Sequence, residues 1–281
     1  MGTASSEAAM PVMERRPLGA TGLQVPAVGM GTWRTFDVRG ERAESRCRAV
    51  LDEAYAAGAT LFDTSPMYGE AERVLSVCMS GRRDEALVAD KLWTTDDAEA
   101  ERQAARAMGW YGGRVDVYQV HNLVRLRHRL ALLARLRDRG AVRVIGATHY
   151  QHSAYPDLLE LVRSGAVQQI QIPYNALDRL AERELLPAAA DHGVGVIVMR
   201  PLGEGALVRR PPSAETLAPL APYGVKTWAQ ALLKFILSDP RVSAVIPATS
   251  HPERMRENAA AGVGPWFDEG VRDYVSKLAS V

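Results

Sequence analysis

Four side chains suited to acid–base chemistry follow three consecutive apolar stretches of the chain. Asp63 and Tyr68 belong to the stretch FDTSPMYG, Lys91 follows the next apolar stretch, and His121 follows the one after it. Carbonyl reduction requires a hydride at the carbon and a proton at the developing alkoxide, so the proton donor must lie close to the oxygen. Residues of these types could form such a donor site.

The tyrosine is the natural proton donor, although its hydroxyl is a weak acid with an ordinary pKa of about 10. We expect the Lys91 ammonium, oriented by Asp63, to stabilise the phenolate of Tyr68 and so lower its pKa. His121 would hydrogen-bond the carbonyl oxygen and fix its approach. In the reverse direction Tyr68 would act as the base for alcohol oxidation.

Each of these side chains also has an ordinary structural explanation. An aspartate at a strand end can cap the following turn, a lysine there can be solvated, and a histidine can be a satisfied core residue. For any one of them alone, that explanation is favoured. Three successive strand ends that carry Asp with Tyr, then Lys, then His favour a common site.

Eight strand-like runs alternate with helical segments and would bring these side chains together. The runs span residues 26–30, 59–62, 86–90, 115–120, 142–147, 166–172, 194–199 and 242–246. Between them, apolar side chains recur at helical spacing over segments such as 97–108, 126–138, 153–163, 184–192 and 227–237. This α/β alternation without a Gly/Ser-rich linker predicts a closed (β/α)₈ TIM barrel, in which the C-terminal strand ends carry the site.

The remaining segments complete this expected organisation. Turn residues at 17–22 predict a short N-terminal β-hairpin, residues 1–12 a flexible tail, and residues 13–281 a single catalytic barrel domain. The glycines within 29–33 do not lead into a glycine-opened helix, which argues against a Rossmann sheet. The Pro- and Gly-rich stretch 201–226 predicts an active-site lid or ligand clamp.

Composition limits the classes of partner. With 281 residues, 47% hydrophobic and 24% charged, and a formal net charge of +1, the chain has no overall field for nucleic acid or an anionic membrane. No apolar run is long enough to span a membrane, and two cysteines among apolar helical positions suit buried thiols in the cytoplasm. No carboxylate or thiol joins His149 and His152 at zinc-ligand spacing, so we expect no metal.

Taken together, the motifs resemble those of the aldo-keto reductase family. The similarity extends from the hairpin to Asn258 and includes Gly29–Trp33, FDTSPMYG with Glu72, Asp90-Lys91, Gln119–Asn122, Gln171, Pro201–Gly203 and residues 245–258. It implies a barrel that binds NADP(H) in extended form across the strand ends. It places Asp63, Tyr68, Lys91 and His121 at the family's catalytic tetrad and implies reversible NADPH-dependent reduction of aldehydes or ketones.

The resemblance also assigns contacts to the nicotinamide and the adenosine phosphate. The carboxamide falls to Thr148, His149 and Gln171, although the first two stand where the family usually has Ser and Asn. Met199 stands where many members place a stacking aromatic ring. The whole expected set is Gly31, Thr32, Trp33, Asp63, Thr148, His149, Gln171, Met199, Pro201, Leu202, Gly203, Ala248, Thr249, Ser250, Arg254, Glu257 and Asn258.

Within that set, the last six residues resemble the family's adenosine-phosphate segment. Thr249 or Ser250 and Arg254 could hold a 2′-phosphate, and Glu257 and Asn258 the adenine. Ala248 replaces a common lysine, so one charge is missing. Arg254 still favours NADPH over NADH, because a guanidinium suits a phosphate dianion.

The expected partner is a small carbonyl substrate, and the sequence predicts no particular oligomeric state. Trp33 and Trp93 could form apolar walls beside Tyr68 and His121, or simply pack at the barrel rim. The link after His121 is short, and only about fifteen residues follow Trp266. These lengths predict a shallow, open pocket and broad aldehyde or ketone acceptance.

Two other functions are compatible with a barrel of this kind. One is an NADPH-binding regulatory or redox-sensing subunit with little turnover, against which the complete tetrad argues. The other is a Schiff-base aldolase that uses Lys91. In an aldolase Asp63 and the phosphate-binding segment have no role.

Overall fold

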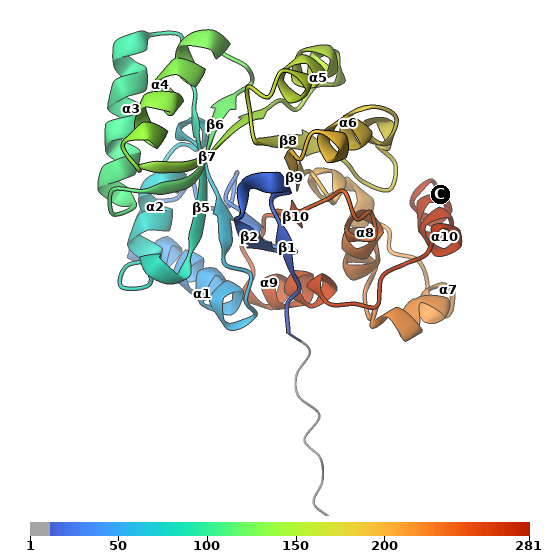
Figure 1. Cartoon of the computed structure of the whole chain (residues 1–281). Coiled ribbons are helices and arrows are strands. Elements are labelled where there is room, and N and C mark those ends of the chain that lie inside the picture. Colours follow the sequence, from blue (N-terminus) through green and yellow to red (C-terminus); the bar gives the residue numbers. More distant parts are fainter. Residues whose placement is uncertain (1–11) are drawn as a thin grey trace, which may run out of the picture.

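The expected parallel barrel is present in the structure, a computed structural model that describes residues 12–281 (Figure 1). Eight strands follow one another in chain order round the barrel, and every pair is parallel. They are β3 (Met30–Gly31), β4 (Leu61–Asp63), β5 (Leu87–Leu92), β6 (Val115–His121), β7 (Val142–Thr148), β8 (Gln169–Pro173), β9 (Gly195–Met199) and β10 (Ala244–Val245). The predicted fold class is confirmed.

The barrel closes between its first and last strands. The backbone N–H of Gly29 donates to the carbonyl of Val245 at 2.8 Å, and Val245 donates back to Ala27 at 2.9 Å. Parallel bridges join Val28 to Val245 and Gly31 to Ala248. Residues far apart in the sequence therefore meet at this seam.

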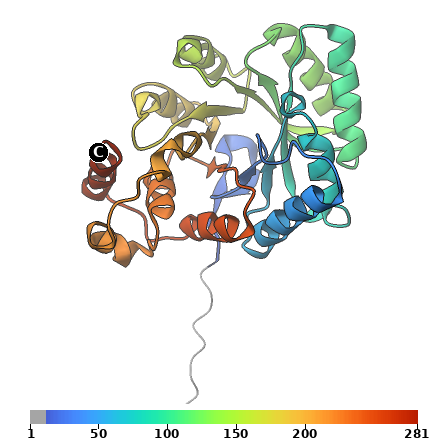
Figure 2. The ribbon, with the colours of Figure 1, turned by 180° about the vertical axis from the view of Figure 1, so that it is seen from behind.

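Helices surround the strands, as the two opposite views show (Figures 1 and 2). They are α1 (Glu41–Ala56), α2 (Ala71–Cys78), α3 (Asp97–Trp110), α4 (Leu126–Asp138), α5 (Tyr155–Arg163), α6 (Leu185–Asp191), α7 (Ala214–Leu217), α8 (Trp228–Leu237), α9 (Pro252–Ala259) and α10 (Glu269–Ala279). Side-chain caps define several starts: Asp96 accepts the N–H of Glu99, and Asp268 that of Val271. Among residues 12–281 no helix is long and apolar enough to cross a membrane.

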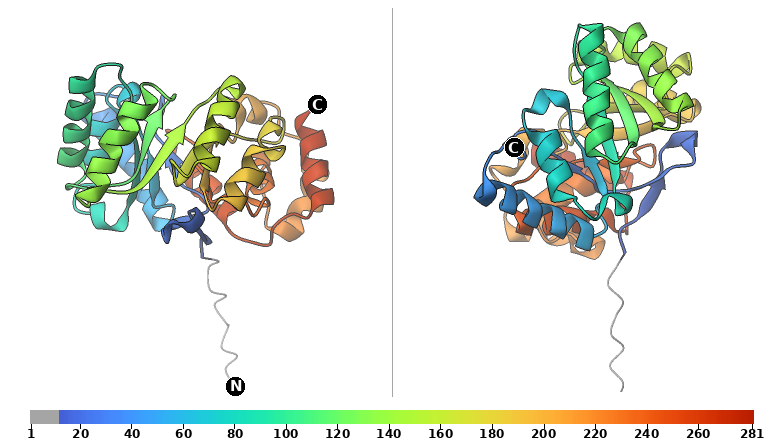
Figure 3. Two further views of the ribbon diagram at one scale, coloured as in Figure 1. Left: turned by 45° about the horizontal axis from the view of Figure 1, so that its top comes forward. Right: turned by 90° about the vertical axis from the view of Figure 1, so that its left-hand side faces the viewer.

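The predicted hairpin is confirmed and closes one end of the barrel (Figure 3). Strands β1 (Arg15–Pro17) and β2 (Gln24–Pro26) pair antiparallel. Leu18, Leu23 and Val25 are buried in one cluster with residues from β4 to β7, from β9 and β10, and with Ile246. The hairpin thus fills the end of the barrel that lies opposite the C-terminal strand ends.

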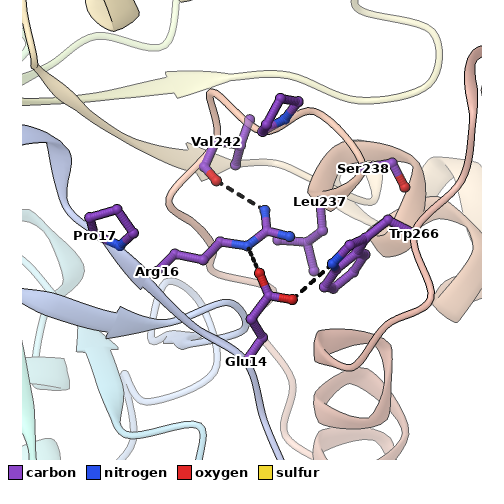
Figure 4. A pocket seen from close by; sticks show the side chains of 8 residues that line it. Glu14, Arg16, Pro17, Leu237, Ser238, Val242 and Trp266 are labelled. Carbon is purple, nitrogen blue, oxygen red and sulfur yellow. Dashed lines mark hydrogen bonds and ion pairs between the residues drawn. The ribbon is translucent and has the colours of Figure 1, made fainter.

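A polar cluster joins this hairpin to the last part of the chain (Figure 4). The Glu14 carboxylate accepts hydrogen bonds from Arg16 Nε and Trp266 Nε1, both at 2.8 Å. The Arg16 guanidinium also donates to the carbonyl of Val242 and lies 4.5 Å from the centre of the Trp266 ring. The cluster borders a cavity of about 270 Å³.

Three further expectations concern the lid, the N-terminal tail and the two cysteines. The stretch expected to form a lid contains the 3₁₀ helices Gly203–Val208 and Ala218–Tyr223 with α7 between them, and Tyr274 of α10 donates to the carbonyl of Thr216 at 2.7 Å. Of the expected tail over 1–12, only Val12 lies within the described residues, and it is exposed. Both cysteines are buried, free thiols, as expected.

Candidate active site

The four residues of the expected acid–base site meet at the C-terminal ends of neighbouring strands. Strand β4 ends at Asp63, β5 carries Lys91, and β6 ends at His121. Tyr68 ends a one-turn 3₁₀ helix, Pro66–Tyr68, directly after β4. The Lys91 Nζ lies 5.2 Å from the centre of the Tyr68 ring.

Lys91 is fully buried, and two oxygens hold its ammonium. Its Nζ donates to Asp63 Oδ1 at 2.6 Å and to the backbone carbonyl of Thr64 at 2.7 Å. Burial acts to lower the pKa of Lys91, but the charge and hydrogen bond of Asp63, together with the charges of Tyr68 and Asp90, more than offset this and leave the pKa raised. Lys91 is therefore a charged, fixed cation beside the tyrosine.

Two glutamines brace the other oxygen of Asp63. Gln171 Nε2 donates to Asp63 Oδ2 at 2.8 Å, and Gln119 Nε2 approaches the same oxygen at 3.4 Å. Gln171, expected on the nicotinamide carboxamide, thus uses its amide nitrogen within the protein. Gln119 had no expected role, although the alternation in β6 places it on the same side of the strand as His121.

A serine that the sequence analysis did not single out holds His121. The Ser65 hydroxyl lies 2.8 Å from His121 Nδ1 and accepts the N–H of Met67 at 3.2 Å. The amide N–H occupies one lone pair of the hydroxyl, and the hydroxyl can donate its own proton to Nδ1 in the tautomer that leaves Nδ1 unprotonated. The other ring nitrogen, Nε2, then carries the hydrogen. The only sequence feature that pointed to Ser65 as a site residue was its position two residues after Asp63.

The pKa values of Tyr68 and His121 are both shifted, and the shift of Tyr68 is opposite to the expected one. Burial raises the pKa of Tyr68 above its ordinary value, although the Lys91 ammonium acts in the opposite direction. The expected net lowering of the Tyr68 pKa is therefore wrong. Burial, together with the charge of Lys91, lowers the pKa of His121 to about 2. At neutral pH Tyr68 is protonated and His121 is uncharged.

The residues expected round the nicotinamide lie along adjoining strand ends. Thr148 ends β7 and is in register with His121 on one side and Gln171 on the other. Met199 ends β9 in register with Pro173, and His149 follows β7 half-buried. Gly31 is in register with Asp63, and the Thr32 hydroxyl donates to the carbonyl of Asp63 at 2.9 Å. Pro201, Leu202 and Gly203 follow β9 after Arg200.

The residues expected round the adenosine phosphate follow β10 and continue into α9. Ala248 bridges to Gly31, Thr249 is buried, and Ser250 and Arg254 are exposed. Arg254 has no ion pair within residues 12–281. Glu257 accepts the hydroxyl of Thr227 at 2.6 Å, and Asn258 is buried. The first turn of α9 and Arg254 offer donors that fit a phosphate.

Large apolar side chains are exposed round the mouth of the barrel. Trp93 follows β5, Met67 precedes Tyr68, and Tyr150 and Leu177 follow β7 and β8. Trp33 is half-buried, and the Arg34 guanidinium covers it at 4.2 Å. Hydrogen bonds from α10 reach Thr216, Ala176 and Tyr174, and within residues 12–281 none joins this helix to Tyr68.

A family model and several known proteins match this chain. The family model described as Aldo/keto reductase family matches residues 27–273. An aldo-keto reductase of Mycolicibacterium smegmatis is 30% identical over 247 residues, covering 84% of each protein. The NADH-specific methylglyoxal reductase of Escherichia coli is 25% identical, covering 89% of this chain and 93% of that protein.

A solved structure agrees with the fold. The aldo/keto reductase from Klebsiella pneumoniae in complex with NADP and acetate has a TM-score of 0.80 at 23% identity, covering 94% of this chain and 95% of that one. The family match spans most of the sequence, and the barrel agrees with it. This chain belongs to the aldo/keto reductase family and is an oxidoreductase.

Proposed function

We propose that this enzyme reduces aldehydes and ketones to alcohols with NADPH, and that Tyr68 is the general acid. The observation that carries the proposal is the fully buried Lys91, held by Asp63 and placed beside the ring of Tyr68. A bound NADPH would supply the hydride. The side chains of the site transfer the proton and position the carbonyl group.

In the proposed reaction Tyr68 donates its proton to the developing alkoxide. The raised pKa keeps the hydroxyl protonated before the reaction. After the transfer, the Lys91 ammonium faces the new phenolate and stabilises its charge, while Asp63 keeps the ammonium in place. In alcohol oxidation Tyr68 must first lose its proton and then accepts one from the alcohol.

His121 positions the carbonyl in this proposal. It is uncharged, and the Ser65 contact at Nδ1 leaves Nε2–H as a donor to the substrate oxygen. A neutral donor holds the oxygen without introducing a second charge that would compete with Lys91. The exposed apolar side chains round the mouth suit apolar or aromatic carbonyl compounds of varied size.

NADPH is the proposed cofactor. Thr148, His149 and the carbonyl oxygen of Gln171 would bind the carboxamide, and Met199 would cover a face of the ring. Arg254 lies in the first turn of α9 and makes no ion pair within the described residues 12–281, which supports a bound 2′-phosphate. The E. coli relative is named as NADH-specific. The choice between NADPH and NADH in this chain is therefore tested by measuring KM for both nucleotides.

Replacing Tyr68 with Phe tests the function directly. Turnover of a panel of aldehydes and ketones should fall by about 10² to 10⁴, because general acid catalysis is lost. NADPH binding, measured by nucleotide fluorescence, should be nearly unchanged.

Tyr55→Phe is the matched control, since the hydroxyl of this tyrosine on α1 bonds the carbonyl of Arg82 and takes no part in the proposed site. Its turnover should resemble that of the wild type. Unchanged turnover in Tyr68→Phe would refute the mechanism. Tight NADPH binding with negligible wild-type turnover over the whole panel would identify a regulatory subunit instead.

A further inference from the structure

The cavity at the base of the barrel lies at the end away from the proposed active site (Figure 4). It has a volume of about 270 Å³ and lies between the hairpin, the chain that joins α8 to β10, and Trp266. Leu237 and Val242 are buried and give it apolar walls, and the exposed rings of Pro17 and Pro240 line its outer side. A concave, mainly apolar space with a few polar groups is typical of a site for a small molecule.

A buried arginine offers a free donor to this cavity. The side chain of Arg16 is 9% exposed, its Nε donates to Glu14 Oε1 at 2.8 Å, and its Nη1 donates to the carbonyl of Val242 at 3.1 Å. Within residues 12–281 its Nη2 has no hydrogen-bond partner. In Figure 4 the guanidinium extends towards the space between Leu237 and Trp266. A buried, charged donor without a partner is unfavourable, so this nitrogen requires an acceptor that enters the cavity.

Two contacts hold this arginine in one orientation. Glu14 Oε2 accepts the N–H of Trp266 Nε1 at 2.8 Å, so the carboxylate is fixed by a partner at each oxygen. The Arg16 guanidinium lies 4.5 Å from the centre of the Trp266 ring. The free donor is therefore in place before a ligand binds, which lowers the entropic cost of binding.

The charges round the cavity favour a ligand with a single negative charge. Lys234 Nζ donates to two backbone carbonyls and lies 4.7 Å from the centre of the Trp266 ring. Burial lowers the pKa of Lys234 to about 8, so this amine is still mainly protonated at neutral pH. Lys234 and the arginine thus outnumber the Glu14 carboxylate, while both oxygens of Asp239 are bonded to Arg241. One negative charge balances this excess, whereas a dianion would reverse it.

We propose that this cavity binds a small apolar carboxylate, of the size of an aromatic acid. The carboxylate accepts a hydrogen bond from Nη2 of Arg16, and the apolar part packs against Leu237, Pro240 and the Trp266 ring. The site lies at the opposite end of the barrel from Tyr68. It therefore does not depend on the proposed reaction.

Benzoate is the probe, and the indole N–H resonance of Trp266 reports its binding, because that group donates to the partner of Arg16. The resonance is assigned by its absence in Trp266→Phe. At constant ionic strength benzoate should shift it saturably. Benzyl alcohol lacks the charge and acetate lacks the ring, so each should bind at least about tenfold more weakly. No saturable shift with benzoate, or an equal affinity for either of the other probes, would overturn the proposal.

Variants measured by isothermal titration calorimetry test the residues. Arg16→Met should weaken benzoate binding about 10- to 100-fold, because a charge-assisted hydrogen bond is lost. Arg15→Met is the matched control, since this exposed neighbour bonds only the carbonyl of Gln24. Pro240→Phe keeps Arg16 and its partners but fills the cavity from an exposed position, so it should also weaken binding at least about tenfold. Full affinity in Pro240→Phe, or equal affinities in the two arginine variants, would refute the site.

A further variant distinguishes the base from the active site. His121→Ala removes the donor proposed for the substrate oxygen and should bind benzoate at the base as the wild type does. Loss of benzoate binding in His121→Ala, with binding retained in Arg16→Met, would place the carboxylate at the active site and contradict the proposal. The titrations need no turnover, so they decide the question even if no carbonyl compound is reduced.

Discussion

The side chains that touch Lys91 and His121 determine what each can do. Lys91 could be a simple strand-end lysine from its sequence position, but its complete burial and two oxygen partners make it a fixed charge. Burial of Tyr68 was not visible in the sequence, so the sequence predicted the wrong direction for its pKa. Residue types were predictable, whereas the balance of burial and charge depended on the folded surroundings.

Ser65 should set the orientation and tautomer of His121. Ser65→Ala removes the partner of Nδ1, and kcat for carbonyl reduction should fall about fivefold to tenfold, because one such hydrogen bond is worth about 1 kcal/mol. NADPH affinity should not change. Ser76→Ala is the matched control, since that hydroxyl bonds only the backbone of its own helix. Equal kcat values in all three proteins would contradict this role.

Arg254 should decide the nucleotide preference. Arg254→Ala should raise the KM for NADPH about 10- to 100-fold, because a charge-assisted hydrogen bond is worth about 1.5 to 3 kcal/mol. The KM for NADH should change little. Arg256→Ala lies on the same helix but removes an ion pair with Glu53, so it controls for general effects on α9. Equal losses with both nucleotides would show that Arg254 does not bind the 2′-phosphate.

At the scale of elements, periodicity predicted most helices and strands, and the exceptions have physical causes. The first strand was expected over 26–30, but β3 spans Met30–Gly31, because Pro26 belongs to β2 of the hairpin and Val28 meets Val245 only through an isolated bridge. Cys78 was expected among apolar helical positions, but the bounds of the eight-residue helix α2 were not predicted, since it is short and follows a loop rich in turn residues. Ser65 and Gln119 were not predicted as site residues, because their partners, His121 and Asp63, lie on strands that are distant in sequence.

The hairpin depends on close approach of its turn to the barrel. Gly19 has φ of 56°, and a Cβ there would lie 2.3 Å from the carbonyl oxygen of Gly193. Gly22 has φ of 76°, and nothing lies within 4 Å of its Cβ position. Gly22→Ala should therefore cost about 1 kcal/mol from backbone strain, and Gly19→Ala about 2 kcal/mol or more.

Urea unfolding of the two glycine variants measures this difference. A lower midpoint at unchanged slope reports lost stability. The comparison isolates the steric term, because both positions share the left-handed backbone. Similar midpoints for the two variants would show that the contact with Gly193 adjusts without cost.

At the scale of the whole molecule, residues from both ends of the chain complete the barrel. Ala27 and Gly29 bond Val245 at the seam. At the base, Glu14 joins the hairpin to Trp266. Because these contacts link the first and last parts of the sequence, we propose that residues 13–281 fold as one domain.

A single domain should unfold in one cooperative step. Trp33 and Trp93 lie in the first half of the barrel and Trp228 and Trp266 in the second, so fluorescence reports on both halves. Urea transitions followed by tryptophan fluorescence and by far-UV circular dichroism should coincide. Glu14→Ala removes the contacts to Arg16 and Trp266 and should lower both midpoints equally, since loss of the base weakens the whole barrel. Two separate transitions, or a shift in one signal alone, would mean that the halves of the barrel unfold independently.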